Sequence, residues 1–326
     1  MNELYPMKFK PRFKEKIWGG QRMKTSLGLD FSPLHNCGEA WVLSGVPGSE
    51  TIVRNGFLKG NELNELVEVY MEDLVGEGSF ERFGNEFPIL VKFIDSNDYL
   101  SIQVHPDDAL ASRRGLGNGK SEMWYILEAE SGAEIISGFN RKTDAGSFLD
   151  FLERKKLKEI LNVEKVSKQD VFYIPAGRIH ALGPGILLAE IQQTSDTTYR
   201  IYDWDRVDEK GNSRELHKEL AIEAIDFNEP QSSRKPYRKT LNQTSPLVDS
   251  PHFTTQIFSF DKPIRKDYRE LDSFVIYVCV EGMTKFESLS SMDNLKKGET
   301  LLIPAITEQI VLSPTEECTI LEVFIS

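Results

Sequence analysis

Two neighbouring segments, Tyr99–Asp108 and Gly117–Tyr125, constrain the fold of this 326-residue chain more than any other feature. Gln103 and His105 stand two apart in the run Leu-Ser-Ile-Gln-Val-His, which is typical of a β-strand. Alternate side chains of a strand share one face, so both residues and Ser101 should point to the same side. We therefore predict a strand that carries polar side chains into a site.

The second segment has a charged residue, Glu122, near the start of an apolar and aromatic run. Charged groups are rarely buried without a partner. Further along the chain, His180 follows the sequence Ile-Pro-Ala-Gly-Arg-Ile. Two imidazoles and a carboxylate suit zinc or another borderline divalent metal. The predicted metal ligands are Gln103, His105, Glu122 and His180.

Each of these residues also has an ordinary structural interpretation. His105 precedes a proline and could cap the end of a strand, and Gln103 could be a polar strand residue. Glu122 could pair with a nearby cationic side chain, and His180 could hydrogen-bond to a turn. The chain has only five histidines, and two of them fall in these segments, which favours a shared metal site.

Four motifs occur in order along the chain: Gln103–Pro106, Lys120–Trp124, Pro175–Ala181 and Ser195–Arg200. Together they resemble the type I mannose-6-phosphate isomerases, a zinc-dependent family with a cupin core. Only 57 residues separate Glu122 from His180, whereas longer family members carry a helical insertion there, so the chain resembles the short bacterial form. The resemblance implies a mainly β fold of two cupin (jelly-roll) β-barrels with short helical segments packed on them.

The resemblance also implies a function and a set of site residues. It implies one Zn²⁺ per chain and interconversion of mannose 6-phosphate and fructose 6-phosphate through a cis-enediol intermediate. Arg200 matches the catalytic arginine of the family. Either Lys120 or Glu190 could move the proton, and the residues leave this choice open. The implied substrate-binding residues are Ser101, Lys92, Asp196 and Arg206.

Two of these assignments have alternatives. Lys92 interrupts the buried run Phe87–Ile94, and it could be a snorkelling lysine instead of a pocket residue. Arg206 is a candidate for binding phosphate, or it could form a solvated pair with Asp205. The run Thr197–Trp204 is predicted as a strand, in which one face would carry two guanidinium groups and two aromatic rings, from Arg200, Tyr202, Trp204 and Arg206.

The chain length favours about two domains. Residues 1–228 are predicted to form a metal-binding catalytic domain, 229–245 a connection rich in Pro, Ser, Lys and Arg, and 246–326 an all-β domain. Helices are expected at about 61–74, with Asn61 as N-cap, at 143–166, with Thr143 or Asp144 as cap, and at 215–227. His217 lies on the last of these and is expected to be a surface or packing residue.

A short sequence repeat, which we call the sequence echo, occurs in both predicted domains. Lys168–His180 and Lys297–Gln309 share Lys, Ile, Pro and Ala at the same offsets, which indicates a repeated β unit. At the offset of His180, the second copy has Gln309. The second copy also has no Gln-x-His pair, so we predict that it holds no metal.

The composition limits the classes of molecule that the protein is expected to bind. A net charge of −12 disfavours nucleic acid and anionic membranes, so a sugar-phosphate site must gather positive charge locally. No apolar run reaches the ~18 residues of a membrane span, and the first residues contain no secretory h-region. Three scattered cysteines fit a reducing compartment, and we predict a cytoplasmic protein. The sequence does not predict an oligomeric state.

Two other functional classes remain open at this stage. A cupin metal oxygenase would usually have a more His-rich site with an open coordination position. A non-catalytic sugar sensor would keep ligand binding when Lys120 or Glu190 is lost, and it would show no turnover. The glutamine ligand and the cationic residues around the predicted site favour the isomerase.

Overall fold

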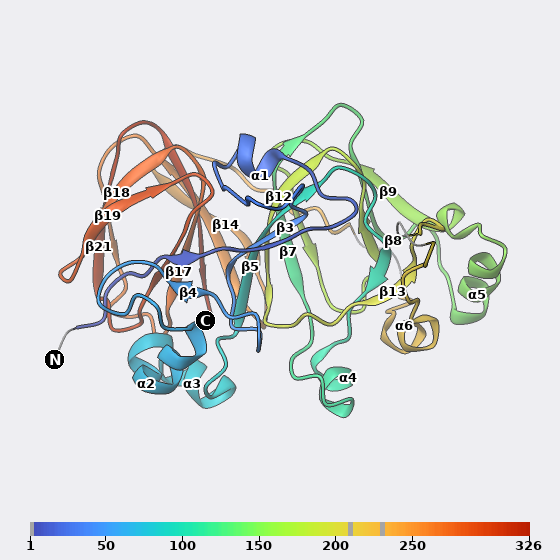
Figure 1. The fold of residues 1–326 in the computed structure, drawn as a ribbon, viewed down its shortest axis with the longest axis horizontal. Helices are drawn as coiled ribbons and strands as arrows, with labels where there is room; N and C mark the ends of the chain where they lie inside the picture. Colours follow the sequence, from blue (N-terminus) through green and yellow to red (C-terminus); the bar gives the residue numbers. More distant parts are fainter. Residues whose placement is uncertain (1–2, 208–210, 229–231) are drawn as a thin grey trace. The chain divides into compact units, whose positions relative to one another are not determined.

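The computed structural model describes residues 3–207, 211–228 and 232–326, which form antiparallel β-strands and a few short helices (Figure 1). Two compact units are distinguished. The terminal unit consists of Met1–Lys14, Gln21–Phe93 and Pro236–Ser326, and the ligand unit consists of Glu15–Gly20 and Ile94–Lys235. The mainly β class is confirmed. The predicted domains were continuous stretches of sequence. The two units are not, because residues 21–93 group with the C-terminal strands.

Two sets of antiparallel strands frame the ligand unit. In one, β7 (Glu122–Ala129) lies between β10 (Val171–Ile174) and β12 (Ile186–Gln193). The other has the order β13 (Tyr199–Tyr202), β6 (Ile102–Val104), β11 (His180–Leu182), β8 (Glu134–Phe139) and β9 (Leu161–Lys165).

Two apolar clusters pack around these strands, and alternation separates the first of them from the polar residues of the site. Ile102 and Val104 pack in one cluster with residues of the helices α5 (Ala145–Glu153) and α6 (Lys218–Ala224). A second cluster joins Trp124 of β7 to Leu182 of β11. Because neighbouring strand residues face opposite sides, Gln103 points away from the face that the helices cover.

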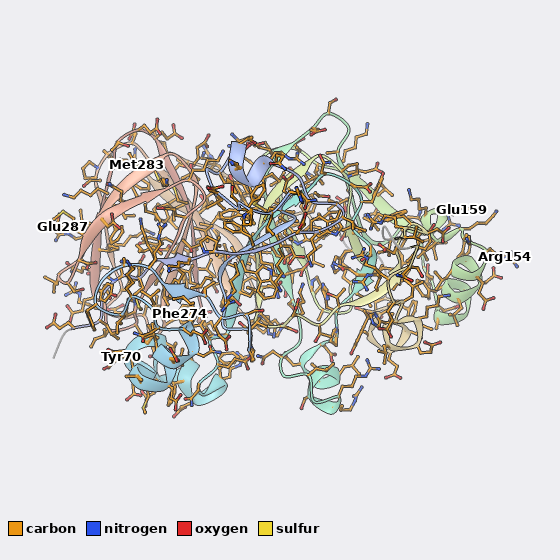
Figure 2. The ribbon with its side chains drawn as sticks, viewed as in Figure 1. Tyr70, Arg154, Glu159, Phe274, Met283 and Glu287 are labelled. Carbon is orange, nitrogen blue, oxygen red and sulfur yellow. The ribbon has the colours of Figure 1, made fainter. Side chains whose placement is uncertain are left out.

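The predicted helical zone at 143–166 is only partly helical. It holds α5, whose N-cap Asp144 accepts a hydrogen bond from the Ser147 N–H, and a 3₁₀ turn at Leu157–Glu159. Figure 2 labels Arg154, which directly follows α5, and Glu159, the last residue of this turn. The rest of the zone is strand β9, because its backbone pairs with β8.

Other helices also differ from expectation. The expected helix at 215–227 is reduced to α6, and a helix that was not predicted, α4 (Asp108–Arg113), follows the first of the two motif segments. Among the residues that the structure describes, no helix is both long and apolar enough to span a membrane.

The predicted strand Thr197–Trp204 is shorter than expected. Its pairing with β6 shifts register between Arg200 and Tyr202, and Trp204 and Asp205 adopt positive φ angles of 59° and 54°. The expectation that one face carries Arg200, Tyr202, Trp204 and Arg206 is therefore wrong. The chain turns before Arg206, and strand alternation no longer applies.

The C-terminal part of the terminal unit is all-β, as predicted. One sheet has the order β14 (Gln243–Asp249), β15 (Thr254–Phe260), β22 (Cys318–Phe324), β17 (Val275–Glu281) and β20 (Thr300–Ile303). The other has the order β16 (Ile264–Asp267), β21 (Gln309–Pro314), β18 (Met283–Glu287) and β19 (Met292–Lys296). The last residues of the predicted connection belong to β14, and its residues 229–231 lie outside the described chain.

The N-terminal part of this unit contributes short strands and helices. The pairs are β1 (Phe9–Lys10) with β4 (Ile52–Val53) and β2 (Arg12–Lys14) with β3 (Glu39–Leu43). Along the chain, α1 (Arg22–Thr25) lies between β2 and β3, and β4 is followed by α2 (Leu63–Val75), α3 (Glu77–Phe83) and β5 (Ile89–Ser96), whose last residues, from Ile94, are assigned to the ligand unit. The N-cap of α2 is Glu62, not Asn61, because Glu62 and Glu65 form a capping box.

Candidate metal centre and active site

His105 and His180 are held by backbone carbonyls in the same way. The Nδ1 of His105 donates to the Thr197 carbonyl at 2.9 Å, and the Nδ1 of His180 donates to the Arg178 carbonyl at 2.8 Å. A neutral imidazole that donates from Nδ1 has its lone pair on Nε2. The ring centroids are 4.8 Å apart, so two Nε2 lone pairs are available within one small space.

Glu122 completes a buried three-residue group. Its two carboxylate oxygens lie 3.5 Å from the Nε2 of His105 and 3.5 Å from the Nε2 of His180. One donor atom from each of the three residues lies within 4.8 Å of the others, and each residue is 1% exposed. Donor atoms about 2 Å from one zinc ion lie roughly 3 to 4 Å from each other. The three residues could therefore hold a metal ion.

Gln103 joins this group from β6. It lies directly opposite His180 in the pairing of β6 with β11, and its Nε2 is 3.2 Å from the Nε2 of His180. Amide oxygen and nitrogen differ only by a rotation of the side-chain amide, so Gln103 can present its oxygen at the same place. The structure thus brings together all four side chains that the sequence predicts as ligands.

The protonation state of His180 suits a ligand. Burial lowers the pKa of His180 to about 4, against the opposing effect of the hydrogen bond to the Arg178 carbonyl. The ring is therefore neutral near pH 7, which is the form that binds a metal.

Lys120 reaches the same group. It is buried, and its Nζ donates to the Glu122 carboxylate and to the Nε2 of His105, the latter at 3.0 Å. The strand parity of Lys120 and Glu122 predicts this arrangement. A cation therefore lies directly beside the candidate ligands.

Glu190 is linked to Glu122 by an indole. The Nε1 of Trp124 donates to Glu122 at 3.1 Å and to Glu190 at 3.0 Å. Glu190 lies opposite Trp124 in the pairing of β12 with β7. Two buried carboxylates thus share one neutral donor.

Arg200 lies opposite Gln103 in the pairing of β13 with β6. Its guanidinium donates from Nη1 to the Glu215 carbonyl at 3.0 Å. Burial, together with the neighbouring positive charge of Arg214, lowers the pKa of Arg200, and the group is still a cation near neutral pH.

Comparisons with known proteins agree with this geometry. A model of the family "Phosphomannose isomerase type I, catalytic domain" matches residues 7–133. A mannose-6-phosphate isomerase of Streptococcus mutans is 32% identical over 326 residues, which cover 96% of this chain and 99% of that protein. The chain belongs to the type I phosphomannose isomerase family.

Further members of the phosphomannose isomerase family match along nearly the whole chain. Mannose-6-phosphate isomerase ManA of Bacillus subtilis is 35% identical over 321 residues, covering 97% of this chain and 98% of that protein. A crystal structure of the mannose 6-phosphate isomerase from Bacillus subtilis has a TM-score of 0.88 at 31% identity, covering 98% and 99% of the two chains. A putative mannosephosphate isomerase from Archaeoglobus fulgidus, at 20% identity and a TM-score of 0.80, shows the fold alone.

Buried polar atoms test whether the site fits the metal that this phosphomannose isomerase resemblance implies. Three side-chain atoms without a hydrogen-bond partner lie across strand pairs from the candidate ligands. They are Ser137 Oγ opposite His180, Gln192 Oε1 opposite Glu122 and Arg200 Nε opposite Gln103. Buried polar atoms without partners are unfavourable. Together with the N/O donor set, they fit a site built for a metal and a polar ligand.

The remaining predicted site residues include Ser101, Asp196 and Lys92. Ser101 is buried two residues before Gln103. Asp196 is exposed in the segment between β12 and β13. Lys92 belongs to the terminal unit, where it is buried with its Nζ 4.9 Å from the centre of the Trp41 ring.

Arg206 makes several contacts in the turn that follows β13. It donates to the Asp203 carboxylate and to the Tyr99 carbonyl, both at 2.6 Å. Burial raises the pKa of Asp203, but hydrogen bonds from Arg214 and Arg206 outweigh this effect and lower it. Phosphate binding by Arg206 stays a prediction.

Four residues near the phosphomannose isomerase site were not singled out from the sequence for these positions: Trp124, Ser137, Gln192 and His217. Trp124 and Gln192 share strand parity with Glu122 and Glu190, so alternation could have indicated them. Ser137 and His217 reach the site through pairing between distant segments, for which the sequence contains no local signal.

Proposed function

We propose that the protein interconverts mannose 6-phosphate and fructose 6-phosphate. The observation that carries this proposal is the buried convergence of His105, Glu122 and His180 with the cation of Lys120 beside them. The family relationship supports the same reaction. A chain with net charge −12 needs such local cations to hold an anionic sugar phosphate.

The proposed metal is one zinc ion per chain, held by Gln103, His105, Glu122 and His180. Neutral imidazoles and a carboxylate are ligands that zinc accepts, and manganese or cobalt are alternatives of similar character. When bound, the ion would supply Lewis-acid stabilisation of negative charge on the sugar oxygens.

The chemical task is to remove a proton from the carbon next to a carbonyl and to return it to the neighbouring carbon. The intermediate is a cis-enediol formed through an enediolate, in which negative charge develops on the former carbonyl oxygen. A second proton passes from the neighbouring hydroxyl to that oxygen as the carbonyl group changes place. A base must lie within hydrogen-bond reach of the proton, and fixed donors must face the developing charge. The chain offers Glu190 and Lys120 for these two roles.

We assign the proton transfer to Glu190 and the stabilisation of charge to Lys120. Glu190 is an acceptor, since the indole of Trp124 donates to it. Lys120 acts as a donor toward both Glu122 and His105. Arg200, opposite Gln103, is proposed to add a second cation for the sugar oxygens. The reverse assignment, with Lys120 as the base, is the second candidate.

Substrate contacts by Ser101, Lys92, Asp196 and Arg206 form part of the proposal. So does a cytoplasmic location, which the three free cysteines support. A non-catalytic sugar sensor or a metal oxygenase would have to use the same buried group without isomerase turnover.

The experiment is an isomerase assay on purified protein together with elemental analysis of bound metal. His180→Ala should lose turnover and zinc, because it removes one imidazole ligand. His35→Ala, at an exposed histidine of the terminal unit, is the matched control and should lose neither. Wild-type protein that binds metal but shows no turnover with zinc, manganese or cobalt would contradict the proposal and favour the sensor or oxygenase.

A further inference from the structure

We propose that His217 is a positioning residue for Arg200. This inference rests on the proposed function, since it concerns the cation assigned there to the sugar oxygens. Two hydrogen bonds join the residues. The backbone N–H of His217 donates to the Arg200 carbonyl at 2.7 Å, and the backbone N–H of Arg200 donates to the Nδ1 of His217 at 3.1 Å. One histidine therefore satisfies both backbone groups of Arg200.

The β-ladder does not hold Arg200 by itself. β13 is an edge strand whose neighbour within its sheet is β6. The N–H and C=O of one strand residue point to the same side, so the groups that bond to His217 point away from β6. The register irregularity after Arg200 weakens the pairing further. His217 thus takes the place of a missing strand at this one residue.

The guanidinium is attached to the same segment. The Nη1 of Arg200 donates to the carbonyl of Glu215, two residues before His217. Backbone and side chain of Arg200 are both bonded to the segment Glu215–His217. A displacement of that segment would therefore move the guanidinium relative to Gln103, which lies opposite Arg200.

The segment itself is anchored to the unit. His217 is the residue immediately before α6, and α6 lies beside β13 (Figure 1). Arg114 ties the other end of α6 to β13: it donates to Glu223 at 2.7 Å, and its guanidinium lies 5.1 Å from the centre of the Tyr199 ring. The imidazole of His217 is 6.3 Å from the same ring. The start of α6 is thus a fixed support for Arg200.

The test compares His217→Phe with His217→Asn. Phenylalanine keeps a ring next to Tyr199 but loses the Nδ1 acceptor, whereas asparagine keeps a short acceptor. We expect His217→Phe to lower kcat about ten- to hundredfold with a smaller change in KM, because a cation misplaced by about 1 Å costs that much. His217→Asn should stay within about threefold of wild type. Zinc content should be unchanged in both variants, since His217 is not one of the proposed metal ligands.

Two controls separate the possible failures. The pair His35→Phe and His35→Asn makes the same changes at an exposed histidine and should leave kcat unchanged. Arg200→Met tests the proposed role of Arg200 directly. If Arg200→Met keeps wild-type activity, the proposed function of Arg200 fails; if it is inactive while His217→Phe is fully active, only the positioning role fails.

A double variant distinguishes positioning from general stability. If His217 acts through Arg200, adding His217→Phe to Arg200→Met should cause no further loss of kcat. An additive loss would overturn the inference. So would a folded, zinc-loaded His217→Asn that is as slow as His217→Phe. If His217→Phe does not fold, His217→Asn still tests the inference, because a folded, zinc-loaded His217→Asn with a roughly tenfold lower kcat would overturn it.

Discussion

The ligand unit and the C-terminal strands of the terminal unit repeat one pairing pattern with opposite chemistry. In the first, Trp124 of β7 lies opposite Glu190 and its indole donates to that carboxylate. In the second, Tyr277 of β17 lies opposite Glu322. Both units thus keep an aromatic residue across from a buried glutamate.

The surroundings of the two glutamates differ. We interpret the pair Lys266–Ile310 of the terminal unit as the counterpart of the pair Gln103–His180, because Lys266 reaches Glu322 and Ile310 lies in the core. Lys266 donates to Glu322 at 2.9 Å, and the hydroxyl of Tyr268 donates to the other oxygen of the same carboxylate. Burial and the Glu322 charge raise the pKa of Tyr277, so its hydroxyl stays protonated.

The comparison shows two ways to keep charge inside a β unit. In the terminal unit, a lysine and a tyrosine satisfy the glutamate, so the cluster is complete without further groups. In the ligand unit, Lys120 and Trp124 likewise donate to Glu122, but two imidazole nitrogens face the same carboxylate, and three neighbouring polar atoms lack partners. The first arrangement is structural, and the second has donor atoms to spare for a metal and a substrate.

The largest expected effect comes from making the ligand unit resemble the terminal unit. His180→Ile introduces the residue that the terminal unit has at the corresponding position. It should abolish zinc binding and lower kcat/KM by at least about a thousandfold, because it removes one imidazole ligand and with it the zinc ion that we propose as the Lewis acid. Metal analysis and the isomerase assay measure this.

The matched change is Ile310→Val in the terminal unit. It should keep zinc and turnover, and cost only about 1 kcal/mol of unfolding free energy for one buried methylene. Loss of zinc from Ile310→Val, or its retention in His180→Ile, would break the comparison.

The second effect is on stability alone. Lys266→Met leaves the buried carboxylate of Glu322 without its cation, and should lower the free energy of unfolding by about 2 to 3 kcal/mol in urea titrations. Zinc content and kcat should not change. The exposed Lys285, on β18 of the same sheet as Lys266, supplies the control Lys285→Met, with an expected change within about 0.5 kcal/mol. If Lys266→Met also lowered the zinc content, the ion pair of Lys266 with Glu322 would not be merely structural.

The third effect is a pH dependence of the metal-free protein. Burial lowers the pKa of His180 from 6.5 to about 4, so the unfolded chain binds this proton more readily than the folded chain. Stability from this group is complete above the unfolded pKa and falls as the pH drops from about 6.5 toward 4. Between pH 8 and pH 5 the loss should be about 2 kcal/mol.

Urea titrations of chelator-treated protein across this range measure the slope. His180→Gln removes the titrating group and should flatten the profile by that amount. An equal slope in both proteins would mean that His180 is not the group responsible.

The sequence predicted features that depend on local spacing. Parity along one strand brought Gln103 and His105 to the same group of side chains, and Asp144 was a correct helix cap. The sequence did not reveal features that depend on pairing between distant segments. The run that forms β9 has apolar residues compatible with a helix, and only its pairing with β8 decides for a strand. The same holds for His217, whose contact with Arg200 bridges 17 positions.

The smallest effect concerns the glutamine that the sequence echo aligned with His180. Gln309 does have the same offset from its Ile-Pro-Ala motif, but it pairs with Asp267 and donates to that largely exposed carboxylate at 3.2 Å. The next residue, Ile310, belongs to the apolar core. The turn before β21 therefore shifts the strand by one residue, and such a shift exchanges its two faces.

Gln309→His should consequently bind no additional zinc and should change the unfolding free energy by no more than about 0.5 kcal/mol, as is usual for a surface position. Ile310→His is the counterpart on the inner face. It places an imidazole in the apolar core near Lys266 and should destabilise by about 2 kcal/mol or more. If Gln309→His destabilised as strongly as Ile310→His, Gln309 would be the inward-facing residue. The counterpart of His180 would then be Gln309, as the sequence offset suggests, and not Ile310.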